Sequence, residues 1–376
     1  HRTPLGTMTA PAPAPVSSIP FTSFRGDTTP TATAPGKIGI MIIMIDPMSP
    51  REAVNQYLEE LREETSKTTH ESHMYRLERF LEWSDENDLD NMNDISGKKL
   101  MMFKKERQRD LAKITLKNQL GTLRQFLEFC EDMNVAPNGV SRRLRLPTVD
   151  IEDEVSDVYI TTEEAEKILE YCNKYEYATR RHVTFHILWQ TGMRSGALRG
   201  LDIDDFEKEG QTISINHRPE SGTPLKNKER GARYVHIDTE LTELITDFLN
   251  MHHPHVEDEN GRMPLVGTQS GRMHKTSLQR NIYTLTRPCH YTNECPHDRE
   301  IDDCEATSYN TASKCPSSVS PHALRKGAVT AHRKGDVLKD IVGERMDMSG
   351  QVLDKHYDKR TKKEKMETRK KYLDSL

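Results

Sequence analysis

The sequence predicts a mainly α-helical fold in two domains with one small β-hairpin, an α+β class. Three observations carry this prediction. Apolar residues recur at three- and four-residue spacing through residues 50–145, with no strand-like alternation. Two short alternating segments stand at 212–215 and 233–237. A proline and an acidic run separate the two halves of the chain. With 376 residues, 34% hydrophobic and 30% charged, the chain fits two modest domains better than one large core.

The N-terminal half predicts a tail followed by four helices. Residues 1–47 are rich in Pro, Ala, Thr and Ser without helical periodicity, which is typical of disorder. Folding signals begin at Ser49-Pro50, an expected N-cap with proline in the first turn. Helical spacing of apolar residues predicts three more helices, around Met74–Trp83, Ile95–Phe103 and Leu116–Cys130. We therefore expect an all-α domain over 48–146.

The second domain is expected over 158–376, after a linker at 147–157. It starts with Thr161-Thr162-Glu163-Glu164, which places acids in the first turn of a helix. The alternating segments Thr212–Ile215 and Arg233–Ile237 predict an antiparallel hairpin. Further helices are predicted near residue 171 and at 186–190, 241–248, 277–285, 322–333, 338–344 and 350–370. A Cys-bearing insertion interrupts these helices at about 287–316.

Charge is segregated along the chain. The net charge of −5 does not by itself predict a nucleic-acid partner, but residues 321–376 hold 15 Lys+Arg against 9 Asp+Glu. Clustered basic residues are what phosphate contacts require. The apolar run at 38–45 is too short to span a bilayer, and we find no signal-peptide pattern. We therefore expect a cytoplasmic protein with no membrane partner.

Three short motifs in the second domain contain residues suited to binding an anion. In Thr191-Gly192-Met193-Arg194, an Arg that follows a Gly turn can present its planar guanidinium. His322 and Arg325 share one face near the start of a helix, a plausible phosphate site. Tyr357 lies in the basic stretch Lys355–Arg360. Taken singly, each motif has a more common structural explanation. The Arg would be a surface ion-pair partner, the His and Arg of the second motif a helix cap and a surface residue, and the Tyr a ring packed on the core.

Together these motifs resemble the tyrosine recombinase family of phage integrases and Xer-like recombinases, in particular its archaeal type, over about residues 50–376. The family's order is an Arg in a T-G-x-R turn, a Lys on a β-hairpin, an H-x-x-R pair, a His or Trp, and a Tyr. The matching residues are Arg194, Lys226, His322, Arg325 and Tyr357, and Tyr357 stands 32 positions after Arg325. The resemblance implies a helical core-binding, SAM-like DNA-binding domain followed by a recombinase catalytic domain.

Two positions depart from the family pattern. The family usually has an acidic residue three positions after the first Arg, where this chain has Ala197. The group before the Tyr normally follows Leu-Gly, and matching Val342-Gly343 to that pair selects Arg345, which we favour. An ungapped count back from Tyr357 selects Met348 instead, which cannot donate a useful hydrogen bond.

The reaction that the resemblance implies is transesterification at a phosphodiester. Arg194 and Arg325 would clamp the non-bridging oxygens, whose charge grows in the transition state, and no cofactor is required. Tyr357 would attack phosphorus as the nucleophile, and because a phenol is weak at neutral pH it needs a positive field or a base. His322 is the candidate base. The product would be a 3′-phosphotyrosyl link.

Lys226 is the candidate acid that protonates the departing 5′ oxygen, and Lys228 in the same loop is the alternative. The implied partner is double-stranded DNA, bound by a homotetramer during synapsis. Two other functions stay open at this point. A type IB topoisomerase shares this chemistry, and a catalytically decayed integrase would bind DNA without cutting it.

Four of the six cysteines lie in the insertion before His322, with His290 and His297 between them. They are Cys289, Cys295, Cys304 and Cys315. Such a group in a cytoplasmic protein predicts a structural Zn²⁺ site, which would brace the approach to His322 and do no chemistry. The spacing is irregular and lacks C-x2-C pairs, so free thiols or one disulfide are the alternative.

Overall fold

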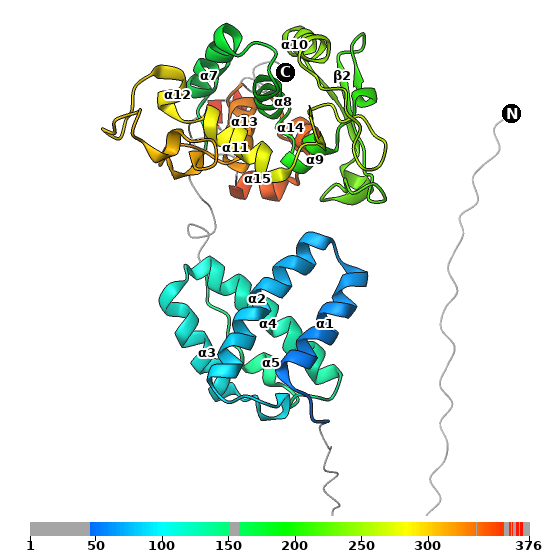
Figure 1. Cartoon of the computed structure of the whole chain (residues 1–376), viewed down its shortest axis with the longest axis vertical. Coiled ribbons are helices and arrows are strands. Elements are labelled where there is room, and N and C mark those ends of the chain that lie inside the picture. The colour runs from blue at the N-terminus through cyan, green and yellow to red at the C-terminus, as the bar shows by residue number, and fades with distance from the viewer. Residues whose placement is uncertain are drawn as a thin grey trace, which may run out of the picture. The chain divides into compact units, whose positions relative to one another are not determined.

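The computed structural model describes residues 46–149, 158–335 and 337–356, and residues 361, 363, 366, 367, 369 and 370. It is mainly helical with a small antiparallel sheet, which confirms the predicted fold class (Figure 1). The chain divides into two compact units between Pro147 and Thr148. The predicted tail up to residue 45 and residues 150–157 of the predicted linker lie outside the described residues. No described helix is both long enough and apolar enough to cross a bilayer.

The N-terminal unit contains the four predicted helices and a short fifth one. They are α1 (Pro50–Glu64), α2 (Lys67–Glu86), α3 (Gly97–Asp110), α4 (Lys113–Asp132) and α5 (Val140–Arg143), with a 3-10 turn at Met92–Asp94. The predicted start of α1 is confirmed: the Ser49 side chain accepts from the Glu52 amide, and the Glu52 carboxylate accepts from the Ser49 amide. Helix α3 begins at Gly97, later than predicted, because Ser96 takes the N-cap position.

The core of the N-terminal unit lies around α4, which packs against α1, α2, α3 and α5. Phe80, Phe103 and Phe126 are fully buried there, and their rings meet at edge-on or tilted angles. The apolar stripe of α4 that the sequence indicated faces this core, including Leu120, Leu127 and Cys130. The unit therefore has a hydrophobic core of its own.

The C-terminal unit combines helices with one three-stranded and one two-stranded sheet. Its first helices are α7 (Thr162–Tyr175), α8 (Arg180–Thr191), α9 (Ser195–Gly200) and α10 (Thr239–Met251). The later ones are α11 (Lys275–Leu285), α12 (Pro288–Thr292), α13 (Pro321–Lys334), α14 (Lys339–Met346) and α15 (Gly350–His356). Short 3-10 turns stand at Ile203–Asp205, Lys228–Gly231, Glu305–Thr307 and Ala312–Lys314. The predicted helix at 350–370 is described continuously only as far as His356.

The predicted hairpin is confirmed. Strands β2 (Thr212–Ile215) and β3 (Arg233–His236) pair antiparallel, with Thr212 opposite His236 and Ile215 opposite Arg233. A two-residue strand β1 (Phe206–Glu207) adds to the outer edge of β2, and it was too short to predict. A separate small hairpin joins β4 (Gly267–Thr268) to β5 (Gly271–Arg272). Residues 216–232 form the loop between β2 and β3, which we call the hairpin loop.

Helix α8 lies at the centre of the C-terminal unit and packs against α7, α9, α10, α11 and α13. Its side chains are buried on nearly all sides, as expected for a helix surrounded by others. It ends at Gly192, whose φ of 58° is left-handed. A Cβ on Gly192 would lie 2.6 Å from Met346 Sδ, so the Met346 side chain would have to shift to accept any other residue there.

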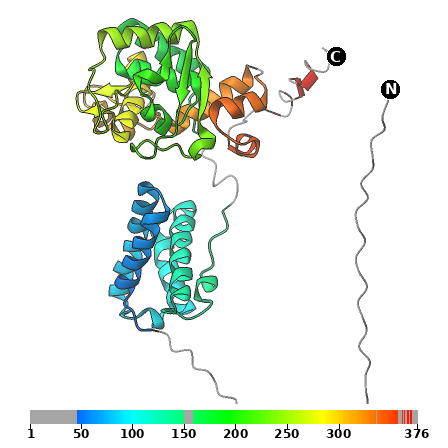
Figure 2. The same ribbon diagram turned by 90° about the vertical axis from the view of Figure 1, so that its right-hand side faces the viewer.

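Helices α13, α14 and α15 follow one another at the end of the described chain (orange to red in Figure 2). A small apolar cluster of Val329, Val342, Met346 and Leu353 joins them. Helix α14 also contacts β3. At the other side of α13, Gly327 allows close approach to the segment before α7, because its Cβ position lies 2.2 Å from the Ile160 carbonyl oxygen.

Gly327→Ala is therefore expected to destabilise the C-terminal unit by roughly 1–3 kcal/mol, since the backbone of residue 160 cannot yield as a side chain would. Gly121→Ala in α4 is the matched control, because nothing lies within 4 Å of its added Cβ. That change should stabilise the N-terminal unit by about 1 kcal/mol through helix propensity. Scanning calorimetry of both variants is the measurement. A Gly327→Ala transition at the wild-type temperature would contradict the assigned close contact.

Candidate active site

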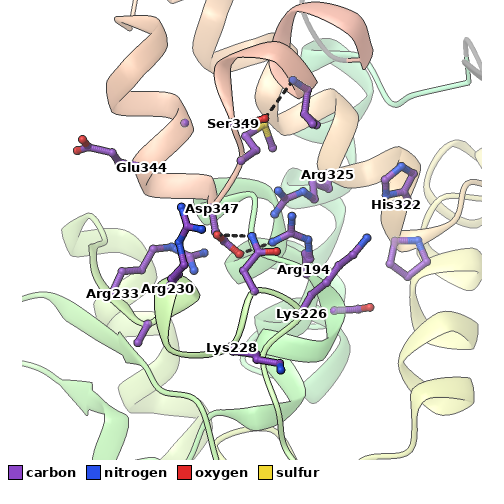
Figure 3. Close-up of a pocket in the computed structure, with 17 residues that line it drawn as sticks. Arg194, Lys226, Lys228, Arg230, Arg233, His322, Arg325, Glu344, Asp347 and Ser349 are labelled. Atoms are coloured by element: carbon purple, nitrogen blue, oxygen red, sulfur yellow. Dashed lines mark hydrogen bonds and ion pairs between the residues drawn. The ribbon is translucent and has the colours of Figure 1, made fainter. Parts of the chain in front are cut away.

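The C-terminal unit contains a positively charged pocket of about 1130 Å³ (Figure 3). Its walls come from the turn after α8, the hairpin loop and β3, the start of α13, the end of α14 and the start of α15. Six Lys and Arg side chains line it against two acids. The basic residues are Arg194, Lys226, Lys228, Arg230, Arg233 and Arg325, and the acids are Glu344 and Asp347. The pocket therefore favours an anion despite the negative net charge of the chain.

The structure brings four of the sequence-predicted residues to this pocket. Arg194, Lys226, His322 and Arg325 all line it, although 131 positions separate the first from the last. Lys228, the alternative to Lys226, lines it as well, and both lysines are exposed in the hairpin loop. The geometry therefore keeps both lysines as candidates.

Arg194 enters the pocket from the turn that ends α8. It is the N-cap residue of α9, with extended backbone angles, and Gly192 two positions earlier makes the turn. Its Nη1 donates to Asp347 Oδ2, and this ion pair joins the turn to the end of α14. The Arg194 side chain keeps 29% of its surface exposed, so much of the guanidinium faces the pocket.

Arg325 is held more rigidly. Arg325 as a whole is only 3% exposed. Nη1 donates to the Gly192 carbonyl at 2.6 Å and Nη2 donates to the Met346 carbonyl at 2.7 Å. Two bonds to separate backbone segments fix the plane of a guanidinium. The charge of Arg325 therefore lies in a defined orientation at the pocket wall before any ligand arrives.

His322 stands in the first turn of α13, beside the pocket arginines. Desolvation in the pocket lowers the pKa of His322 below its usual range, and the positive charges of Lys326 and Arg325 lower it further. A lowered pKa keeps the imidazole neutral at neutral pH. A neutral imidazole can accept a proton, which is what a general base must do.

The structure does not bring Arg345 into the pocket. Its Nη1 donates to the His236 carbonyl at 2.8 Å and its Nη2 to the Gln190 carbonyl at 3.2 Å. Met348, the residue that the ungapped count selected, does line the pocket. The physical reason is the end of α14 at Asp347, whose left-handed backbone redirects the chain between the two positions.

Tyr357, the predicted nucleophile, lies outside the described residues. The described part of α15 ends at His356, the preceding residue in the chain. The start of this helix borders the pocket, since Ser349 and Val352 are among its lining residues.

Sequence reasoning missed several polar residues of the pocket, among them Asn227, Arg230, Arg233 and Asp347. Arg233 lies on β3, where Nε donates to the Arg345 carbonyl and Nη1 to the Gly231 carbonyl, both at 2.8 Å. Burial lowers the pKa of Arg233 to about 10, which still leaves it charged at neutral pH. The basic run through the hairpin loop was a usable signal for the two arginines. Asp347 gave no such signal, because its partners are remote in sequence.

The predicted zinc site is not supported. Among the described residues, no group of three or more His, Cys, Asp or Glu side chains could hold a metal ion. Cys289, Cys295, Cys304 and Cys315 are all free thiols. Burial raises the pKa of Cys289, whereas a hydrogen bond from the Ala306 backbone lowers the pKa of Cys304. These thiols form neither a disulfide nor, among the described residues, a group with metal-ligand geometry, which agrees with the free-thiol alternative.

This arrangement suits a phosphate group. Arg194 and Arg325 converge from two elements, and lysines of the hairpin loop face them from another (Figure 3). Guanidinium forks match the geometry of phosphate oxygens, and lysine adds point charge on a mobile stem. A neutral imidazole beside them provides a proton acceptor. The pocket can therefore bind a phosphate ester, stabilise extra negative charge on it and accept a proton.

Two family models match the chain. Residues 158–347 match the Phage integrase family, and residues 54–133 match the Phage integrase N-terminal SAM-like domain. The first match includes the four predicted pocket residues Arg194, Lys226, His322 and Arg325 and ends before Tyr357.

Solved structures of integrases share the fold. A Tn1549 transposon integrase in complex with a circular intermediate DNA has 13% identity and a TM-score of 0.64, over 86% of this chain and 99% of that one. A lambda integrase dimer bound to a COC′ core site has 12% identity and a TM-score of 0.60, over 84% and 79%. A lambda integrase tetramer bound to a Holliday junction has 11% identity and a TM-score of 0.57, over 85% and 81%.

The family match spans half of the chain, and the SAM-like domain precedes it in the expected order. The pocket arginines, the hairpin lysines and the histidine all fall within that match. The chain therefore belongs to the phage integrase family, the tyrosine recombinases, whose members transfer DNA strands.

Proposed function

We propose that this protein is a site-specific DNA recombinase that cuts and rejoins DNA strands through a 3′-phosphotyrosyl intermediate, with Tyr357 as the nucleophile. One observation carries the proposal. Arg194, the lysines of the hairpin loop, and the His322/Arg325 pair line one pocket, although they come from three distant parts of the sequence. Their order along the chain is the order that the family requires.

The two arginines would stabilise the transition state. Attack on a phosphodiester gives a pentacoordinate phosphorus with extra negative charge on its non-bridging oxygens. Arg325 is fixed by two backbone carbonyls, and Arg194 is fixed by Asp347, so neither has to reorganise when that charge develops. Fixed donors in a partly desolvated pocket are worth more than mobile ones in water.

Proton transfer would fall to His322 and to a lysine of the hairpin loop. His322 is neutral at neutral pH because its pKa is lowered, so it can take the proton of the tyrosine hydroxyl. Lys226 would give a proton to the departing 5′ oxygen, and Lys228 is the alternative in the same loop. The phosphotyrosyl bond keeps the energy of the phosphodiester, so religation consumes no nucleotide.

The partner would be double-stranded DNA, and the active assembly a homotetramer that joins two duplexes. Relatives of the same fold have been solved on DNA, including a lambda integrase tetramer on a Holliday junction. In this chain the supporting observation is the surplus of positive charge in the pocket. Bound phosphates release counterions from DNA, so affinity should fall steeply with salt.

A non-catalytic DNA-binding function is the second candidate. Two observations favour it, namely Ala197 in place of the usual acid, and a pocket lined by Met348, which the ungapped count selects, in place of Arg345. Such a protein would keep the positive pocket and its affinity for DNA but would not form a covalent bond.

A nicked suicide substrate distinguishes the two candidates. Once a strand is cut, the short fragment beyond the nick diffuses away, so the covalent intermediate accumulates. We expect the wild-type chain to form a protein–DNA adduct that survives denaturing electrophoresis. Tyr357→Phe should form none while its DNA affinity stays within about twofold, because only the attacking oxygen is lost. Tight binding without any wild-type adduct would support the non-catalytic candidate.

Changes to the two arginines should separate chemistry from binding. Arg194→Ala is expected to slow single-turnover cleavage by about 10³-fold or more. DNA affinity should change little, because many other Lys and Arg contact phosphates. Arg325 calls for a more conservative substitution than Ala. Arg325→Ala would leave two buried carbonyls without hydrogen bonds, and each would cost about 1–3 kcal/mol of folding stability.

Arg325→Lys keeps the charge but loses the fork, so its cleavage should fall to a similar extent with the fold intact. Circular dichroism and thermal melting check the fold of both variants. Loss of all DNA binding in Arg194→Ala would contradict the assigned role.

Cleavage should also depend on the protonation of His322. The base acts only when neutral, and its pKa is lowered from the usual value of about 6.5. The cleavage rate at subsaturating DNA should therefore stay level from pH 8 down to about 6.5 and fall only below that value. The His322→Asn variant should cleave more slowly than the wild type at every pH, and its cleavage rate should not fall at low pH. An acidic limb centred above pH 7 in the wild type would exclude His322 as the base.

A further inference from the structure

Asp347 is a carboxylate inside a pocket built for an anion, which calls for an explanation. We propose that Asp347 is a positioning residue that holds the Arg194 guanidinium and the hairpin loop together in the geometry that cleavage requires. This inference rests on the proposed recombinase function and adds to it a residue that does not touch the reacting atoms.

The contacts of Asp347 reach two separate elements. Oδ2 accepts from Arg194 Nη1, in the turn after α8, and Oδ1 accepts from Asn227 Nδ2 at 2.7 Å (Figure 3). Asn227 follows Lys226 directly in the hairpin loop. One carboxylate therefore links the first arginine to the loop that carries both candidate lysines. The side chain is only 14% exposed, so water competes weakly for these bonds.

Asp347 is itself well anchored. It caps the C-terminus of α14 in the left-handed conformation, with φ of 53°, and its amide donates to the Glu344 carbonyl. The next amide, of Met348, donates to the Gly343 carbonyl at 2.9 Å. The two preceding carbonyls accept from Arg233 and Arg325. The carboxylate therefore stands on backbone that is fixed on both sides.

A guanidinium has donors enough for two roles. Arg194 uses Nη1 for Asp347, while its remaining N–H groups leave room for a phosphate oxygen. Position 197, where the family usually has an acid, is Ala. Glu344, the other acid of the pocket, forms no ion pair with Arg194 among the described residues. Asp347 is thus the carboxylate that orients Arg194 in the described part of the chain.

A competing role for the carboxylate makes the opposite prediction. If Asp347 only occupied the place of the phosphate, its removal would free Arg194 and speed cleavage. If it positions Arg194 and the hairpin loop, its removal slows cleavage even though the pocket becomes more positive. The sign of the change in rate therefore decides between the two roles.

The test compares Asp347→Ala and Asp347→Asn with Glu344→Gln, which removes one negative charge from the same pocket. Asp340→Asn, in the exposed first turn of α14, is the control that should behave as wild type. We expect single-turnover cleavage of the suicide substrate to fall about 100-fold in Asp347→Ala, the scale of a misplaced catalytic group. Its dissociation constant for DNA should stay equal or become lower. Asp347→Asn keeps a hydrogen-bond acceptor, so its cleavage rate should fall less than that of Asp347→Ala.

A second measurement does not depend on activity. Losing the Asn227 anchor should loosen the hairpin loop, so trypsin should cut after its basic residues about tenfold faster in Asp347→Ala and in Asn227→Ala. Glu344→Gln should digest at the wild-type rate. If the wild-type chain forms no covalent adduct, the proposed function fails and this digestion still tests the positioning role.

Three results would overturn the inference. The first is cleavage by Asp347→Ala at or above the wild-type rate, which would make the carboxylate a competitor of the phosphate. The second is an unchanged rate of tryptic cleavage in the hairpin loop, which would mean that Asp347 does not hold it. A loss in Asp347→Ala no larger than the change in Glu344→Gln would likewise assign the effect to charge alone.

Discussion

The carbonyl end of helix α14 holds the positive charges of the pocket in place. The last carbonyls of a helix have no partner within it, and they carry the negative end of the helix dipole. Arg233 and Arg325 donate to the carbonyls of the last two helical residues. Arg194 donates to the side chain of Asp347, the capping residue. Three guanidiniums that would otherwise repel one another thus bind to acceptors at one helix end. The bonds from Arg233 and Arg325 also give the last carbonyls of the helix their hydrogen-bond partners.

This arrangement connects the pocket to the last helices of the chain. A small apolar cluster that includes Val329, Val342 and Leu353 holds α14 between α13 and α15. Gly192, at the end of α8, leaves room for the Met346 side chain against the turn. A displacement of α14 would therefore move the acceptors of all three arginines together. The position of α14 and the orientation of the three pocket arginines are thus physically coupled.

Much of the fold could be predicted because its signals are local. Helices showed in the spacing of apolar residues, the start of α1 in its Ser49-Pro50 cap, and the hairpin in two alternating segments. The exceptions have equally local causes. Helix α3 begins later than predicted because Ser96 competes for the cap, and β1 is too short to form a pattern. Periodicity and capping act within one or two turns, which is the range that a single sequence reports.

The sequence by itself determined the order of the motifs and therefore the family, since Arg194, His322 and Arg325 stand in patterns that can be read in place. Only the tertiary structure shows that Arg345 lies outside the pocket and that Asp347 lines it. It also shows that the four insertion cysteines form no metal site among the described residues. The physical reason is distance along the chain. The partners of Asp347 are more than a hundred residues away, and such contacts exist only after the helices and the hairpin loop have packed together.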